Sequence, residues 1–155
     1  MTDRTVLITG CSSGIGECVA HGLAGRGYRV LATARREEDV QRLQAAGLES
    51  FQLDVAEPAS VEAGVEQTLQ RTGGTLYALF NNGAYGQPGA VEDLTRDVLR
   101  EQFETNLFGW HDLTRQVLPV MRRQGYGRII QNSSVLGFVA LAYRCLLYTS
   151  DAADE

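Results

Sequence analysis

The residues best suited to chemistry lie at positions 9–16, where the sequence is TGCSSGIG. A short β-branched run precedes them and an apolar pattern with helical spacing follows over 14–27, which predicts a strand–turn–helix unit. Gly10 permits the tight turn, Gly14 lets the backbone approach a ligand, and Gly16 allows close helix–strand packing. The helix N-terminus then offers free N–H groups and a positive dipole end to a pyrophosphate. The spacing is G-x-x-x-G-x-G rather than the commoner G-x-G-x-x-G, and a simple βα turn is the alternative interpretation.

The same stretch also matches the nucleophile-elbow pattern of serine hydrolases, G-x-S-x-G, at GCSSG (10–14). A catalytic triad would require an acid and then a histidine after the serine. The only later histidine is His111, which falls in the middle of a predicted helix, and the position after the first strand is wrong for an elbow. A serine hydrolase is kept as an alternative that labelling of Ser12 by a fluorophosphonate would support.

Two adjacent arginines follow the second predicted strand, in ATARR (32–36). A dinucleotide-binding enzyme that selects NAD usually has an Asp or Glu here, which binds the ribose 2′-hydroxyl. This sequence has Arg35 and Arg36 instead, and arginine pairs well with a 2′-phosphate. The pair predicts NADP(H) in preference to NAD(H), with a solvated pair at a strand end as the alternative.

Polar residues also follow the later strands and interrupt one helix. Asp54 ends the third strand, where its carboxylate would bind an adenine amino group or form a turn. Asn81 and Gly83 belong to the turn sequence NNGA, for which a ligand contact and a structural role are both open. Asn106 is a poor helix-interior residue among apolar neighbours, so it needs polar partners. Ser134, in NSS, ends the fifth strand, where doubly wound sheets bind ligands, and a capping serine is the alternative.

Alternating strands and helices are predicted to position these residues. The apolar pattern predicts strands over 4–9, 28–34, 49–55, 75–82 and 127–134, and helices over 14–27, 37–47, about 58–73 and about 98–123. Pro119 should kink the last helix. The alternation predicts an α/β fold, a doubly wound parallel sheet of the Rossmann-like type with helices on both faces and right-handed crossovers.

Composition restricts the remaining function classes. The 155 residues suffice for one domain, and 44% hydrophobic with 21% charged residues is ordinary for a soluble globular protein. The net charge of −5 provides no basic stripe, so neither nucleic acid nor an anionic membrane is expected as a partner. No apolar run would span a bilayer and no signal peptide is recognisable, which predicts a cytoplasmic protein. Three cysteines and two histidines form no cluster, so no metal site is expected.

The order and spacing of these motifs resemble the short-chain dehydrogenase/reductase family over residues 4–144. The resemblance rests on TGxxxGxG at 9–16, Asp54, NNGA at 81–84, Asn106 and the serine pair at 133–134. It implies an NADP(H)-dependent oxidoreductase that interconverts a small-molecule carbonyl and an alcohol by hydride transfer. It also implies a parent protein that forms homo-oligomers, often through the long helix. The segment LFNNGAYGQPGAVEDL is similar to members that act on aldehydes, retinoids or hydroxysteroids, although NNGA stands where the family usually has NNAG.

The resemblance further implies roles for individual residues. Asn106 and Ser134 would be catalytic, with Ser134 holding the carbonyl oxygen and Asn106 supporting a proton relay. The residues implied to bind the cofactor are Gly10, Ser12, Ser13, Gly14, Ile15, Gly16, Arg35, Arg36, Asp54, Asn81 and Gly83. The family completes its catalytic set with Tyr-x-x-x-Lys, whose tyrosine is the general acid and base.

This Tyr-x-x-x-Lys segment is missing from the sequence. The family spacing places the tyrosine at position 147, which is a leucine, and Tyr148 is one place late. The chain has no lysine anywhere to lower the pKa of a phenol. The last residues, CLLYTSDAADE (145–155), resemble the translation of a transposase library adapter.

We therefore expect an incomplete dinucleotide-binding domain over 1–144, truncated after the fifth strand, and a non-native tail over 145–155. Such a chain would be catalytically incomplete, because it lacks the general acid. A natural acidic C-terminus is the alternative, and it would favour a non-catalytic nucleotide-binding module.

Overall fold

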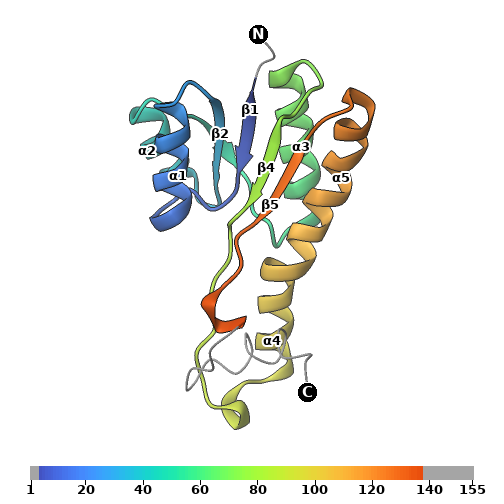
Figure 1. Cartoon of the computed structure of the whole chain (residues 1–155). Helices are drawn as coiled ribbons and strands as arrows, with labels where there is room; N and C mark the ends of the chain where they lie inside the picture. The colour runs from blue at the N-terminus through green and yellow to red at the C-terminus, as the bar shows by residue number, and fades with distance from the viewer. Residues whose placement is uncertain (1–3, 138–155) are drawn as a thin grey trace.

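The computed structural model describes residues 4–137, which form a parallel sheet covered by helices on both faces (Figure 1). The strands are β1 (Thr5–Ile8), β2 (Arg29–Ala34), β3 (Glu49–Gln52), β4 (Ala78–Asn81) and β5 (Arg128–Gln131). The α-helices are α1 (Gly14–Ala24), α2 (Glu37–Ala45), α3 (Pro58–Thr72), α4 (Arg96–Phe103) and α5 (Gly109–Gln124). Every predicted element is present. Within residues 4–137, no helix is both long enough and apolar enough to cross a bilayer.

The strand order is β3-β2-β1-β4-β5, and neighbouring strands are parallel. The chain adds β2 and β3 on one side of β1 and then returns to place β4 and β5 on the other side. This order confirms the predicted doubly wound, Rossmann-like sheet. It creates a topological switch point between β1 and β4, and ligands of such sheets bind at the carboxyl ends of the strands there.

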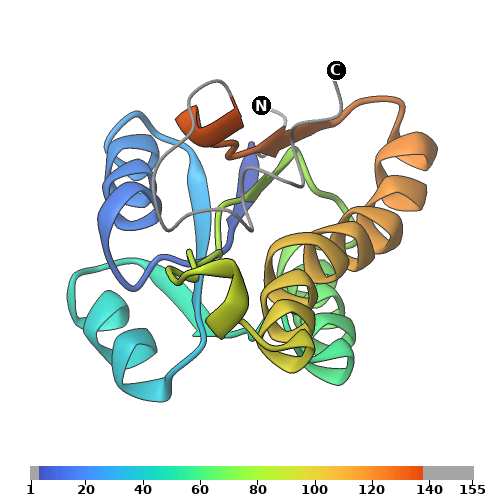
Figure 2. The same cartoon turned by 90° about the horizontal axis from the view of Figure 1, so that it is seen from below.

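Helices lie on both faces of the sheet (Figure 2), and an apolar core on each face holds the layers together. Successive residues of β1 alternate between them, because strand side chains point to opposite faces in turn. Val6 and Ile8 pack in the core under α1 and α2, whereas Leu7 packs in the core under α3 and α5. Burial on both faces explains why β1 consists of apolar and β-branched residues without polar alternation.

The helix predicted over 98–123 extends from α4 to α5 but is not α-helical throughout. Its middle turn, Glu104–Phe108, is a π-helical segment, and Asn106 lies within it. The next residue, Gly109, allows a close approach to the sheet, because a Cβ there would overlap a backbone carbonyl of the β3–α3 connection. α5 continues through Pro119, so the proline does not end the helix.

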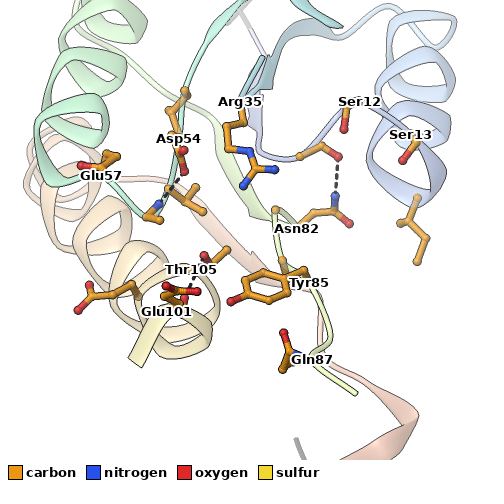
Figure 3. A pocket seen from close by; sticks show the side chains of 18 residues that line it. Ser12, Ser13, Arg35, Asp54, Glu57, Asn82, Tyr85, Gln87, Glu101 and Thr105 are labelled. Carbon is orange, nitrogen blue, oxygen red and sulfur yellow. Dashed lines mark hydrogen bonds between the residues drawn. The ribbon is translucent and has the colours of Figure 1, made fainter. Parts of the chain in front are cut away.

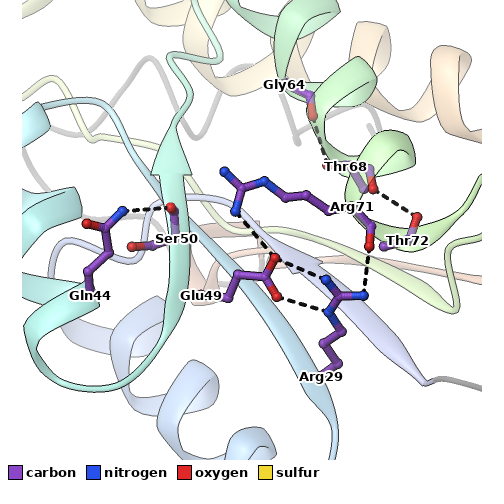
Figure 4. Close-up of polar contacts among 8 residues, drawn as sticks. All are labelled: Arg29, Gln44, Glu49, Ser50, Gly64, Thr68, Arg71 and Thr72. Carbon is purple, nitrogen blue, oxygen red and sulfur yellow. Dashed lines mark hydrogen bonds and ion pairs between the residues drawn. The ribbon is translucent and has the colours of Figure 1, made fainter.

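An ion-pair network at the amino ends of β2 and β3 ties both strands to α3 (Figure 4). Glu49 accepts hydrogen bonds from Arg29 at 2.9 and 3.1 Å and from Arg71 at 3.3 Å. Arg29 also donates to the backbone carbonyl of Arg71 at 2.9 Å. The hydrogen bonds from Arg29, with the further contribution of Arg71, hold the pKa of Glu49 below its ordinary value.

Replacing Glu49 by glutamine is expected to lower the free energy of unfolding by about 1 kcal/mol at neutral pH, a small value because solvent screens this partly exposed network. The folded-state pKa is lowered, so the contribution is present above the ordinary value of 4.5 and is lost as the pH falls through the folded-state value. Urea unfolding should show a difference between the two proteins at pH 7 that shrinks on acidification. Glu62→Gln, an exposed change on α3, is the control. An equal loss in both variants would contradict the prediction.

Candidate functional site

The turn between β1 and α1 has the geometry that its glycines predict. Gly10 and Gly14 have φ values of 67° and 60°, in the left-handed region that favours glycine. A Cβ on Gly10 would lie 2.5 Å from the Cα of Gly83, and a Cβ on Gly16 would overlap the carbonyl oxygen of Gly10. The turn, the start of α1 and the loop after β4 therefore pack more closely than side chains would allow.

The first turn of α1 presents backbone donors that have no side-chain acceptor. Ser13 is the N-cap residue and has an extended backbone, and no side chain in the described part of the chain caps the helix there. The first N–H groups of a helix have no partner within the helix, and the helix dipole places partial positive charge beside them. This end of α1 is therefore suited to bind an anion.

A cleft of about 950 Å³ opens beside this turn, at the carboxyl ends of the strands (Figure 3). It lies at the switch point between β1 and β4, where the fold predicts a ligand. Its walls come from the β1–α1 turn, the segments after β2, β3 and β4, and the α4 side of the long helix. The predicted cofactor-binding residues that line it are Gly10, Ser12, Ser13, Ile15, Arg35, Asp54 and Gly83.

Arg35 and Arg36 are adjacent in the sequence but lie in different surroundings. Arg35 extends into the cleft and is the one basic residue among the described residues that line it (Figure 3). Arg36 is the N-cap residue of α2, and its Nε donates to Asp39 Oδ2 at 3.2 Å. The structure therefore brings Arg35 to the cleft and leaves Arg36, for which the sequence predicts the same role, outside it.

Asn81 and Asn82 likewise point in opposite directions. The Asn81 side chain is 0% exposed, and its Nδ2 donates to Thr114 Oγ1 of α5 at 3.1 Å, away from the cleft. Asn82, which the sequence analysis did not select, lines the cleft and donates to the carbonyl oxygens of Thr9 and Gly10 at 3.0 and 3.1 Å. Asn81 is thus a core residue, and Asn82 fastens the glycine-rich turn to the loop after β4.

Asp54 combines a turn role with an accessible carboxylate. Its Oδ1 accepts the backbone N–H of Ala56 at 3.0 Å, which fixes the connection to α3. Its backbone N–H donates to Ser60 Oγ at 2.9 Å. Asp54 also lines the cleft, so the turn role is confirmed and the adenine contact stays a prediction.

Asn106 has the polar partners that its position in the helix requires. Its Oδ1 accepts the backbone N–H of Tyr85 at 3.1 Å, and its Nδ2 donates to the carbonyl oxygen of Tyr85 at 2.7 Å. One turn later, Trp110 Nε1 donates to the carbonyl oxygen of Gly83 at 2.8 Å. The long helix therefore holds the loop after β4 at two points, although Asn106 itself does not line the cleft.

Ser134 occupies a turn after β5. Its Oγ accepts the backbone N–H of Leu136 at 3.1 Å, which is the capping role kept as an alternative. It does not line the cleft. Tyr148 and the expected tail over 145–155 lie outside the described residues.

Tyr85 and three acidic residues of the cleft escaped the sequence analysis. The Tyr85 ring lies across the cleft, and its hydroxyl points toward Glu101 and Thr105 (Figure 3). Burial raises the pKa of Tyr85, the charge of Glu101 raises it further, and Arg35 lowers it. Glu57, Glu101 and Glu104 line the cleft together with Asp54, so the cleft holds four carboxylates and Arg35. These residues come from separate elements, and no local motif marks them.

Cys11, in the glycine-rich turn, is buried and its Sγ donates to the carbonyl oxygen of Ile8 at 3.4 Å. Burial raises the pKa of its thiol to about 12, against an opposing hydrogen bond with the backbone of Thr33. Cys18, one turn into α1, is exposed. Among the described residues, no group of three or more His, Cys, Asp or Glu side chains is placed to hold a metal ion.

Iodoacetamide at pH 8 is expected to alkylate Cys18 at least about 100-fold faster than Cys11, because the thiolate is the reactive form. Mass spectrometry of peptides from briefly labelled native protein checks this. In guanidinium chloride the two peptides should react at similar rates. Similar rates in the native protein would show that the turn opens readily.

Most of the chain is similar to known oxidoreductases. The family model described as short chain dehydrogenase matches residues 4–153. The match continues past Arg144 into the segment that the sequence analysis interprets as a non-native tail. The uncharacterized oxidoreductase YbbO of Escherichia coli K12 is 38% identical over 98% of this chain and 58% of its own length. Human retinol dehydrogenase 8 is 37% identical over 98% of this chain and 51% of its own length.

Solved structures show the same relationship. A short-chain dehydrogenase from Streptomyces avermitilis superposes with a TM-score of 0.89 at 35% identity, covering 98% of this chain and 57% of that chain. The F189W actinorhodin polyketide ketoreductase with NADPH gives a TM-score of 0.87 at 32% identity, covering 96% of this chain and 60% of that chain. The chain thus spans just over half the length of the curated relatives described above. It belongs to the short-chain dehydrogenase family of oxidoreductases.

Proposed function

We propose that the chain binds NADP(H) in the cleft and forms the cofactor-binding part of an oxidoreductase that interconverts a carbonyl and an alcohol. The observation that supports this most directly is the position of the uncapped first turn of α1. It begins at Ser13, beside the cleft that Ser12, Ser13 and Arg35 line. A helix dipole, backbone donors and a guanidinium together favour a ligand with several phosphate groups.

The described residues fit such a dinucleotide. A Cβ on Gly10 or Gly16 would overlap neighbouring backbone, so these two glycines let the turn pack closely against the loop after β4 and the start of α1. A Cβ on Gly14 would have no atom within 4 Å, so the backbone there is open to a pyrophosphate. Ser13 begins the helix whose N–H groups would bind it. Arg35 would pair with the 2′-phosphate, and Asp54 would accept a hydrogen bond from the adenine amino group through the oxygen that the turn does not use. When bound, the nicotinamide would donate or accept the hydride.

The names of similar proteins support the reaction class. One relative is named for retinol, and one solved structure is a ketoreductase with NADPH. We infer a small-molecule substrate of the aldehyde, ketone, retinoid or hydroxysteroid type for the parent protein.

We further propose that Ser134 holds the substrate oxygen and that Asn106 acts on the site by fixing the loop that carries Tyr85. The general acid and its lysine are missing from this sequence, which has no lysine at any position. The dinucleotide-binding domain would then comprise residues 1–144, with 145–155 as a non-native tail. On this proposal the chain as given binds cofactor without turning over substrate.

A homo-oligomeric parent is part of the same proposal. Leu107 and Phe108, in the π-helical segment, each expose 50% of their surface on the long helix. Adjacent exposed apolar side chains suit contact with a second copy.

Two alternative functions are a non-catalytic nucleotide-binding module and a serine hydrolase. The absence of lysine supports a non-catalytic nucleotide-binding module, which is how this chain would behave by itself. The G-x-S-x-G pattern at 10–14 is the only support for a serine hydrolase. Neither Ser12 Oγ nor Ser13 Oγ has a hydrogen bond to a histidine within residues 4–137, and a hydrolase would need that base.

The test is a titration of the chain with NADPH, followed through the single tryptophan, Trp110, whose Nε1 touches the cleft loop at Gly83. Binding should quench Trp110 by energy transfer to the reduced nicotinamide. A panel of aldehydes and ketones should show no NADPH oxidation above background. Failure to bind NADPH would overturn the proposal. Turnover that Tyr148→Phe abolishes would show that Tyr148 is the general acid after all.

A further inference from the structure

Arg42 of α2 reaches across to the glycine-rich turn and binds its backbone at Ser12, two residues beyond the carbonyl of Gly10 that Asn82 binds. Its Nη2 donates to the carbonyl oxygen of Ser12, and its Nη1 donates to Glu17 Oε1, both at 2.5 Å. Asp39 Oδ1, one turn earlier on α2, lies 3.7 Å from Nη2. One guanidinium thus joins the turn, the first turn of α1 and α2, using the fork of donors that only arginine has.

The contact with Ser12 determines where the next N–H group points. In a planar trans peptide, the carbonyl of one residue and the N–H of the next point in opposite directions. Because the Ser12 carbonyl points toward Arg42 on α2, the N–H of Ser13 must point away from α2. Ser12 and Ser13 both line the cleft, so this peptide forms part of its wall.

We propose that Arg42 is a positioning residue that holds the Ser12–Ser13 peptide in the orientation required for phosphate binding. The inference rests on the proposed binding of a dinucleotide in the cleft. Arg42 does not line the cleft itself and acts through the backbone of Ser12, which does.

Because the Arg42 side chain is exposed to solvent, its loss should affect phosphate binding more than the free energy of unfolding. Its side chain is 46% exposed, and exposed ion pairs contribute little to the free energy of unfolding. The ion pair with Glu17 offers a different explanation of how Arg42 would favour phosphate binding. An unpaired carboxylate in the first turn of α1 would repel phosphate, and Arg42 neutralises that charge. The two explanations predict different behaviour when both side chains are changed.

Arg42→Met is expected to weaken binding of NADPH and of NADH by the same factor, about tenfold, with the melting temperature within about 2 °C of wild type. The double variant Arg42→Met with Glu17→Gln should remain equally weak, because the Ser12 carbonyl is still not held. Arg42→Lys should recover part of the loss, since lysine supplies one donor direction at a time. Arg26→Met, an exposed change beyond the other end of α1, is the control and should bind as wild type.

Several results would overturn the proposal. Unchanged affinity in Arg42→Met would remove the positioning role, and full recovery in the double variant would assign the effect to neutralisation of Glu17. A large fall in melting temperature that accompanies the loss of binding would make Arg42 a structural residue. If wild type binds neither dinucleotide, the proposed function fails and this inference fails with it, whereas wild-type binding without an effect of Arg42 overturns the inference alone.

Discussion

Replacing Gly16 by alanine is expected to weaken NADPH binding at least about 100-fold and to lower the free energy of unfolding by about 2 kcal/mol. A single methyl group causes both effects, because a Cβ at this position would overlap the carbonyl oxygen of Gly10 and lie 2.6 Å from Asn82 Nδ2. The carbonyl belongs to the backbone and has no rotamer by which to move away. Either α1 or the turn must shift, and the backbone donors of the first helical turn shift with it.

The matched control for this change lies on the same helix. Gly22 also belongs to α1, and a Cβ there would meet nothing within 4 Å. Because alanine is favoured over glycine inside a helix, Gly22→Ala should raise the free energy of unfolding by about 0.5–1 kcal/mol and leave NADPH affinity unchanged. Urea unfolding and a Trp110 titration of both variants measure the two quantities. Equal behaviour of the two variants would show that the contact of Gly16 with the turn does not matter.

Replacing Arg35 by alanine is expected to weaken NADPH binding by about 10–100-fold, equivalent to about 1.5–3 kcal/mol for a charged phosphate contact. The effect should be large because Arg35 is the one basic residue among the described residues that line the cleft. Without it, a 2′-phosphate would face Asp54, Glu57, Glu101 and Glu104. NADH lacks the 2′-phosphate, so its affinity should change by less than about threefold.

Arg36→Ala is the matched control for this prediction. Arg36 has the same charge one position later, but it pairs with Asp39 outside the cleft. Its removal should therefore leave the ratio of NADPH to NADH affinity close to that of wild type. Dissociation constants for both dinucleotides, measured at one fixed salt concentration, decide the matter. An equal loss for NADPH and NADH in Arg35→Ala, or a larger change of the ratio in Arg36→Ala, would contradict the assignment of Arg35.

The sequence by itself determined the fold and the central turn of the site. The alternation of apolar runs predicted the five strands, the α-helical segments and a doubly wound parallel sheet, because each run reflects local burial on a sheet or helix. The spacing of Gly10, Gly14 and Gly16 predicted the turn, because left-handed φ values and close backbone packing exclude other residues. These requirements depend on a few neighbouring residues, so the order of residues is sufficient to reveal them.

Only the tertiary structure decided which of two adjacent similar residues faces the cleft. The cleft is lined by Asn82 and not Asn81, and by Arg35 and not Arg36. Neighbouring side chains at the end of a strand point to opposite sides, and the register of the sheet selects which side faces the cleft. Tyr85 shares the cleft with Glu101 and Arg35 only because three separate elements converge there. Such contacts depend on distances between elements far apart in the chain, and the order of residues within any one element does not contain them.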